Sequence, residues 1–181
     1  EQTEGFFARQ EIQDLRALIR WLAHPSDLSC LMQVLASPIG AVTDTVCLAN
    51  LEAAREESPD LFKQGQALLT ALDASGEGRA AMLLHWRTHA QAVSPSLSLE
   101  AMMREIALPD LYRQHFGPGE GDQAAANLMQ MLELIFGLQG EGVLSWQILD
   151  RTLMEYADHG QLGNAPTTSN AVCLMTIHKS K

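Results

Sequence analysis

The chain has 181 residues, 46% of them hydrophobic, so one domain of ordinary size can bury a core. Its 12 Lys and Arg residues against 22 Asp and Glu residues give a formal net charge of −10, which excludes a surface that grips nucleic acid through many phosphates. No stretch approaches the roughly 18 apolar residues of a membrane helix and the acidic start is not a signal peptide, so we expect a soluble, cytoplasmic protein without a membrane partner.

Apolar residues recur at helical spacing through most of the chain, and breaks rich in Gly, Pro and Ser separate the periodic segments. Good N-cap residues precede several of them, namely Ser26, Thr43, Ser58, Asp122 and Ser145. In chain order, the pattern predicts helices at 8–23, 27–36, 44–56, 59–73, 79–93, 98–108, 109–116, 123–135 and 146–159.

The C-terminal segment differs from everything before it. Residues 161–170 form a linker rich in Gly, Pro, Asn, Ser and Thr, and 171–177 is a continuous apolar run. Such a run is typical of a strand that is buried on both faces in a parallel sheet. Since no earlier segment could pair with it, we predict a mainly α protein: an irregular multi-helix insertion domain with one C-terminal strand that belongs to an α/β domain outside the chain.

Three polar residues stand at the end of this predicted strand. Thr176 and His178 are two positions apart and project to the same face, and Lys179 begins the following loop. Ligands bind at the carboxyl edge of parallel sheets, where these groups could hold a phosphate or stack on a base of single-stranded DNA. A strand-end histidine without a ligand is the alternative.

A second candidate lies at the turn 38–44, which leads into the third predicted helix. Free backbone N–H groups and the Thr43 hydroxyl could bind a duplex phosphate there. The alternative that we favour is a plain N-cap, whose loss in Thr43→Ala would cost about 1 kcal/mol.

Metal binding is not expected. Cys30, Cys47 and Cys173 are widely spaced in apolar surroundings, which favours reduced thiols over a disulfide framework or a zinc site. His85 and His89 are one helical turn apart, but a third ligand is not evident. We interpret them as two polar residues on one helix face.

Both ends of the chain resemble one protein family. The ending AVCLMTIHKSK resembles the opening of motif V of UvrD/Rep-type superfamily 1 DNA helicases. The segment GFFARQEIQDLRALIRWLAHPSD at 5–27 is similar to the end of the first piece of their second motor domain, through Phe6, Phe7, Arg9, Glu11, Ile12 and Asp14. Between these motifs the family carries a helical insertion called domain 2B. The resemblance therefore implies a linking helix at 1–24, a 2B-like domain at 25–160, and at 161–181 a linker with the start of a RecA-like strand.

The resemblance also indicates a branch of the family. The segment SPIGAVTD has Ser37 and Pro38, but Ala41, Val42 and Thr43 stand where UvrD-type helicases carry a glycine motif. This pattern and the segment WRTHAQAVSPSLSLEAMM look like the RecB/AddA, or helicase-nuclease, branch. The side chains of Ala41 and Val42 weaken the case for duplex binding at this turn.

The function that the resemblance implies is that of an accessory domain in an ATP-dependent DNA helicase that acts in repair or recombination, with exonuclease activity if the parent carries a nuclease domain. The chain lacks a phosphate-binding loop, so we expect no catalysis and no cofactor in it, whereas the parent would use ATP and Mg²⁺. Implied partners are DNA, contacted through Thr176 and His178, the motor domains of the same chain, and a second subunit of a helicase-nuclease complex. A free-standing helical protein-interaction module with an acidic surface is the alternative.

Overall fold

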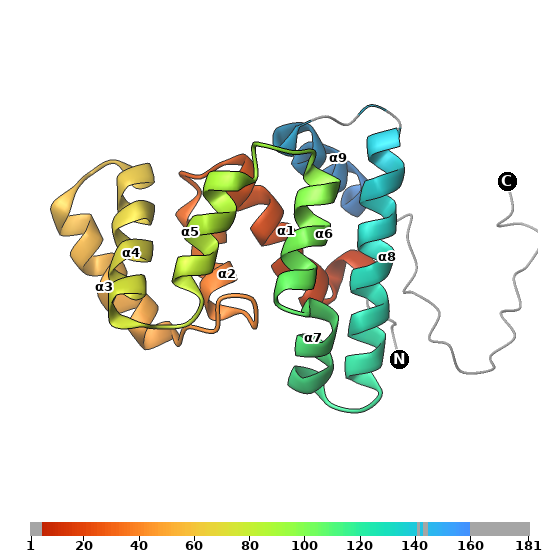
Figure 1. Ribbon diagram of the computed structural model, residues 1–181, viewed down its shortest axis with the longest axis horizontal. Coiled ribbons are helices and arrows are strands. Elements are labelled where there is room, and N and C mark those ends of the chain that lie inside the picture. Colours follow the sequence, from red (N-terminus) through yellow and green to blue (C-terminus); the bar gives the residue numbers. More distant parts are fainter. Residues whose placement is uncertain (1–4, 141, 143–144, 160–181) are drawn as a thin grey trace, which may run out of the picture.

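The computed structural model describes residues 5–140, 142 and 145–159 (Figure 1). Every regular element in these ranges is helical, which confirms the mainly α prediction. The predicted linker and strand at 161–181 lie outside the described residues. Within the described part, none of the helices combines the length and the apolar character needed to cross a membrane.

A short 3-10 helix and nine α-helices follow one another along the described part of the chain. They are η1 (Phe6–Ala8), α1 (Gln10–Ala23), α2 (Leu28–Ala36), α3 (Asp44–Glu57), α4 (Leu61–Ser75), α5 (Ala80–His89), α6 (Pro95–Glu105), α7 (Leu108–Phe116), α8 (Glu120–Gly140) and α9 (Trp146–His159). All nine predicted helices therefore exist, with shifted ends.

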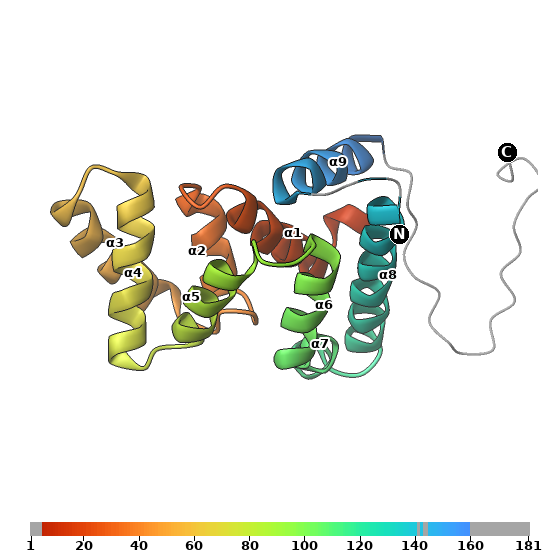
Figure 2. The same ribbon diagram turned by 45° about the horizontal axis from the view of Figure 1, so that its top comes forward.

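Helix α1 lies at the centre of the core. It packs against α2, α8 and α9, and it buries Ile12, Leu15, Ile19 and Trp21 completely. Helices α6, α7 and α8 pack together on one side of it, while the antiparallel pair α3–α4 projects on the other and reaches the core through α2 and α5 (Figures 1 and 2). Different helices thus cover different parts of the apolar surface that the sequence predicts for α1.

Aspartates cap two helices for which serines were predicted. Asp27, and not Ser26, accepts a hydrogen bond from a first-turn amide of α2 at 3.1 Å. Asp60, and not Ser58, accepts two from the first turn of α4, at 2.9 and 3.2 Å. Both helices therefore start later than predicted. Ser145 does cap α9, where its Oγ accepts from the amide of Ile148 at 3.2 Å.

Two further helix starts were predicted too late. Helix α6 begins at Pro95, three residues before the predicted start, because proline fits the first turn of a helix. Helix α8 begins at Glu120, so Asp122 lies inside its first turn and is not its cap.

The turn after α2 closes against the start of α5. The carbonyl of Gly40 accepts a hydrogen bond from the amide of Arg79 at 2.8 Å, and Arg79 Nη1 donates to the carbonyls of Pro38 at 2.6 Å and Ile39 at 3.2 Å. The α3–α4 pair therefore leaves the core and returns to it at nearly the same point.

The two ends of the described chain also lie close together. Helix η1 and the last turn of α9 are both found on the α8 side of the molecule, far from the α3–α4 pair (Figures 1 and 2). A chain that enters and leaves on one side is arranged as an inserted domain would be.

Candidate functional site

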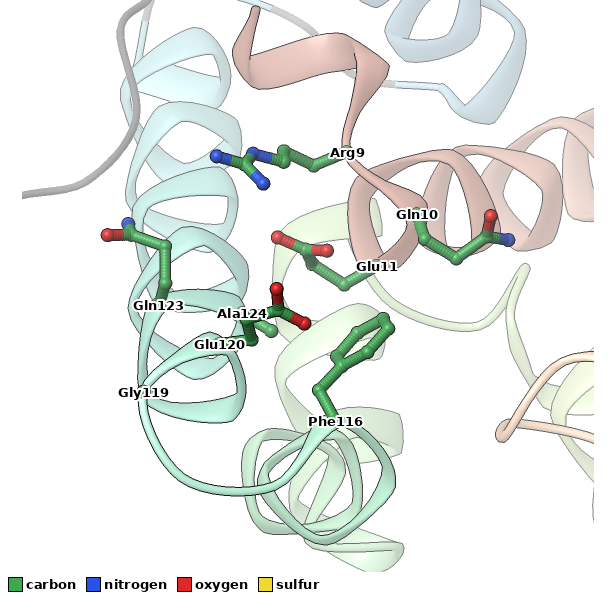
Figure 3. A pocket seen from close by; sticks show the side chains of 8 residues that line it. All are labelled: Arg9, Gln10, Glu11, Phe116, Gly119, Glu120, Gln123 and Ala124. Atoms are coloured by element: carbon green, nitrogen blue, oxygen red, sulfur yellow. The ribbon is translucent and has the colours of Figure 1, made fainter. Parts of the chain in front are cut away.

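One candidate site is a pocket of about 380 Å³ where the start of α1 faces the α7–α8 turn. The residues that line it come from the start of α1, the end of α7 and the start of α8. They are Arg9, Gln10, Glu11, Phe116, Gly119, Glu120, Gln123 and Ala124 (Figure 3). Most of these side chains are polar, so the pocket is suited to a ligand that makes hydrogen bonds.

Arg9 supplies the positive charge of this pocket. It occupies the N-cap position of α1 with extended backbone, and its guanidinium points across towards α8 (Figure 3). The Nε atom is buried and has no hydrogen-bond partner in the described part of the chain. A buried N–H group without an acceptor lowers the stability of the fold, so a ligand that supplies an acceptor here would bind favourably.

Carboxylates lie opposite Arg9. Glu11 is only 4% exposed and accepts a hydrogen bond from Asn127 Nδ2 at 2.7 Å, while Asn127 Oδ1 accepts from Gln123 at 2.9 Å. Glu120 is exposed at the start of α8, and its side chain reaches into the same space (Figure 3). No ion pair joins Arg9 to either carboxylate among the described residues.

A second buried carboxylate lies one turn further along α1. Asp14 is 1% exposed; its Oδ2 accepts from the Tyr112 hydroxyl at 2.6 Å, and its Oδ1 accepts from Gln10 at 2.8 Å and Gln33 at 3.3 Å. Burial, followed by the negative charge of Asp14, raises the pKa of the Tyr112 hydroxyl, which therefore remains a donor. This network joins α1 to α2 and α7, and it includes one residue of the pocket wall, Gln10.

A smaller pocket of about 220 Å³ carries arginines on the exposed face of α1. Burial lowers the pKa of Arg16, against the opposing effect of Asp150, whereas a hydrogen bond from Arg20 to Asp27 at 2.9 Å raises the pKa of Arg20. Asp150 lines the same pocket. Because acidic groups already compensate both arginines, this pocket is a weaker candidate for an anion.

The structure places Thr43 at the N-cap of α3, as predicted, but its side chain makes no capping hydrogen bond. Three of the amides that were expected to be free in the preceding turn are paired. The amides of Gly40, Ala41 and Val42 donate to the carbonyls of Val34, Ser37 and Leu35. The Thr43 hydroxyl is exposed, and phosphate binding at the start of α3 stays a prediction.

Of the other predicted site residues, Thr176, His178 and Lys179 lie outside the described residues, so their proximity to DNA stays a prediction. His85 and His89 stack with ring centroids 4.1 Å apart, and His89 Nδ1 lies 2.9 Å from the His85 carbonyl. In the part of the chain that the structure describes, no group of three or more His, Cys, Asp or Glu side chains could hold a metal ion.

The sequence alone did not identify the pocket at Arg9. The sequence does contain an indication of it. Glu11 and Asp14 are charged residues at positions that the helical periodicity of α1 places towards the core. Charged residues are rarely buried without partners, so their position predicts polar groups on the facing helices. Which helices supply Tyr112 and Asn127, about 100 residues away, follows only from the fold.

No protein-family model matches the chain. It is 26% identical over 191 residues to an ATP-dependent helicase/nuclease subunit of Exiguobacterium sibiricum, in an alignment that covers 100% of this chain and 16% of the relative. It is 25% identical over 188 residues to the ATP-dependent DNA helicase Rep of Escherichia coli, in an alignment that covers 98% of this chain and 28% of the relative. The chain thus spans less than a third of each relative, and it is similar from end to end to one segment of UvrD/Rep-type ATP-dependent helicases.

Proposed function

We propose that this chain is an accessory helical domain, of the 2B type, in an ATP-dependent DNA helicase of the helicase-nuclease branch. The observation that carries the proposal is the similarity along the whole chain to two proteins named as ATP-dependent helicases. The position of both described ends on the α8 side supports it further, because an inserted domain is connected to its host on one side (Figures 1 and 2).

In this proposal the domain does not catalyse a reaction. It moves as a rigid body against the motor domains, which bind ATP and Mg²⁺, and so regulates unwinding during DNA repair or recombination in the cytoplasm. Thr176, His178 and Lys179 contact single-stranded DNA at the edge of the motor sheet, and Thr43 contributes at most one duplex contact. A second subunit of a helicase-nuclease complex is a further partner.

The gene provides the first test. Its reading frame should encode a phosphate-binding loop before residue 1 and Gly-Leu-Glu after residue 181. The product of that extended frame, called the long product below, should hydrolyse ATP when DNA is added, and the 181-residue chain alone should not. DNA-stimulated ATP hydrolysis by the 181-residue chain, or none by the long product, would overturn the proposal.

His178→Ala in the long product tests the proposed DNA contact. We expect it to reduce DNA-stimulated ATP hydrolysis while the DNA-independent rate is retained, because the imidazole would lie on the path of the strand. His89→Ala is the matched control, since His89 is exposed on α5. Equal effects of the two substitutions would refute the assignment.

The alternative, a free-standing protein-interaction module, is favoured by the net charge of −10. A reading frame that lacks both helicase segments would support this module instead.

A further inference from the structure

The pocket at Arg9 contains a buried donor that no described residue satisfies. Arg9 Nε is the unpaired atom, and Gln10 and Gln123 add further amide groups to the same walls. Phe116 lies at its base as an apolar surface (Figure 3). The pocket therefore offers an occupant both hydrogen bonds and an apolar contact.

The charges around the pocket exclude the simplest ligands. Glu11 and Glu120 stand opposite Arg9, and the chain as a whole carries a net charge of −10, so a phosphate or a DNA strand would be repelled. A lone cation would in turn be repelled by Arg9. An extended peptide avoids both problems, because its carbonyls accept from Arg9 and its N–H groups donate to the carboxylates.

The position of the pocket indicates where such a peptide comes from. Arg9 directly follows η1, the first described element, and the end of α9 lies on the same α8 side of the molecule (Figures 1 and 2). The two relatives extend far beyond the matched segment, which is 16% and 28% of their lengths. Chain that precedes these residues in a longer polypeptide would therefore enter the domain through η1, next to this pocket.

We infer that the pocket is a docking site for a peptide loop of the motor domain in the same polypeptide. This inference rests on the proposed function. The Nε–H of Arg9 donates to a carbonyl of the loop, the carboxylates of Glu11 and Glu120 accept from its N–H groups, and Phe116 packs against one of its side chains. The contact stabilises one of the orientations that the helical domain adopts as it moves relative to its host.

Hydrogen exchange in the long product tests this inference. Amides at 117–124 should exchange about tenfold more slowly there than in the 181-residue chain, because a docked loop covers the α7–α8 turn. Arg9→Ala should abolish the difference, and Arg9→Lys should restore little of it, since lysine keeps the charge but lacks the Nε–H. Arg104→Ala, on the exposed face of α6, is the control and should retain the protection.

A photo-crosslinking residue at position 120 identifies the occupant. Crosslinks in the long product to residues outside these 181 support the inference. Crosslinks to DNA or to a second copy, crosslinks confined to the 181 residues, or unchanged protection in Arg9→Ala overturn it. Because neither readout depends on ATP hydrolysis, a long product that docks the loop without DNA-stimulated turnover would refute the proposed function and leave the docking site standing.

Discussion

Asp14 is held in the core by neutral donors only. Tyr112, Gln10 and Gln33 each donate to it, and in the described part of the chain no arginine or lysine pairs with its carboxylate. Hydrogen bonds to a buried charge stabilise a fold more than neutral ones do, and an unsatisfied charge is expensive. The Tyr112 hydroxyl is the one of these donors that links the carboxylate on α1 to α7.

Tyr112→Phe should lower the free energy of unfolding by about 2 kcal/mol, because it removes a donor to a buried carboxylate while keeping the ring. Urea denaturation followed by circular dichroism measures the change. Tyr156→Phe is the matched control: Tyr156 is only half-buried in α9, and its loss should change stability by less than about 0.5 kcal/mol. Equal effects of the two substitutions would show that the bond to Asp14 adds no stability.

Cys30 should be unreactive at neutral pH. Burial, with the nearby charge of Asp27, raises the pKa of its thiol from 9.0 to about 11. At pH 8 the folded chain should therefore contain about a hundredfold less Cys30 thiolate than the unfolded chain. The folded chain has the higher thiol pKa, so keeping Cys30 protonated stabilises the fold. This contribution to the free energy of unfolding is complete below pH 9.0 and declines as the pH rises towards about 11.

Iodoacetamide labelling, resolved by peptide mass spectrometry, checks this expectation. Cys30 should react slowly at pH 8 in the folded chain and quickly in urea. Rapid labelling of folded Cys30 at pH 8 would be inconsistent with a raised pKa.

Among the helices, the caps of α3 and α4 form a natural comparison. Asp60 makes two hydrogen bonds to the first turn of α4, whereas Thr43 makes none to α3. Asp60→Ala should therefore cost about 1 kcal/mol, and Thr43→Ala less than about 0.5 kcal/mol, in place of the roughly 1 kcal/mol that the sequence alone predicts. Chemical denaturation of both variants decides, and the reverse order would mean that the Thr43 hydroxyl caps α3 in solution.

The link between α4 and α5 contains two glycines with positive φ and different surroundings. Gly76 has φ +71° and open space at its Cβ position, whereas Gly78 has φ +59° and a Cβ would lie 2.4 Å from both the Gly40 carbonyl oxygen and Val42 Cγ2. Gly76→Ala should cost about 1 kcal/mol through backbone strain alone. Gly78→Ala should cost about 3 kcal/mol or more, because the clash adds to the strain.

Thermal denaturation of both glycine variants measures this difference. Similar melting temperatures for the two would show that the turn moves away from the new methyl group without cost.

The sequence predicts helices better than their ends. Periodicity located all nine helices, because burial of one apolar stripe decides where a helix forms. The ends depend on which of several nearby polar side chains reaches a free amide, and at α4 Asp60 does so while Ser58 was an equally good candidate. The hydrogen bond between Arg79 and Gly40 joins residues far apart in sequence, and no local sequence pattern predicts it.

For the molecule as a whole, the net charge of −10 governs its behaviour towards DNA. At physiological salt the 181-residue chain should bind duplex or single-stranded DNA no more tightly than roughly 10⁻⁶ M, the limit of non-specific contacts. Fluorescence anisotropy at two salt concentrations measures this, with the long product as the control that should bind more tightly. Tight binding by the 181-residue chain would place a DNA site within it.

The sequence predicts which residues of the candidate site are unusual, but not what each of them contacts. The residues of the N-terminal motif were recognised as a group, yet their roles differ: Glu11 and Asp14 hold facing helices, and Arg9 faces a pocket. A sequence shows which side chains are unusual, but the partner of each is chosen by tertiary packing.

The closure of the 38–42 turn on Arg79 makes the α3–α4 pair a region whose length can vary in evolution. Because the backbone departs and returns at neighbouring points, the α3–α4 pair can grow or shrink without a shift of the helices around α1. Insertions and deletions among related proteins should therefore accumulate in this hairpin, and the loop between its two helices is the natural place to splice in a reporter domain.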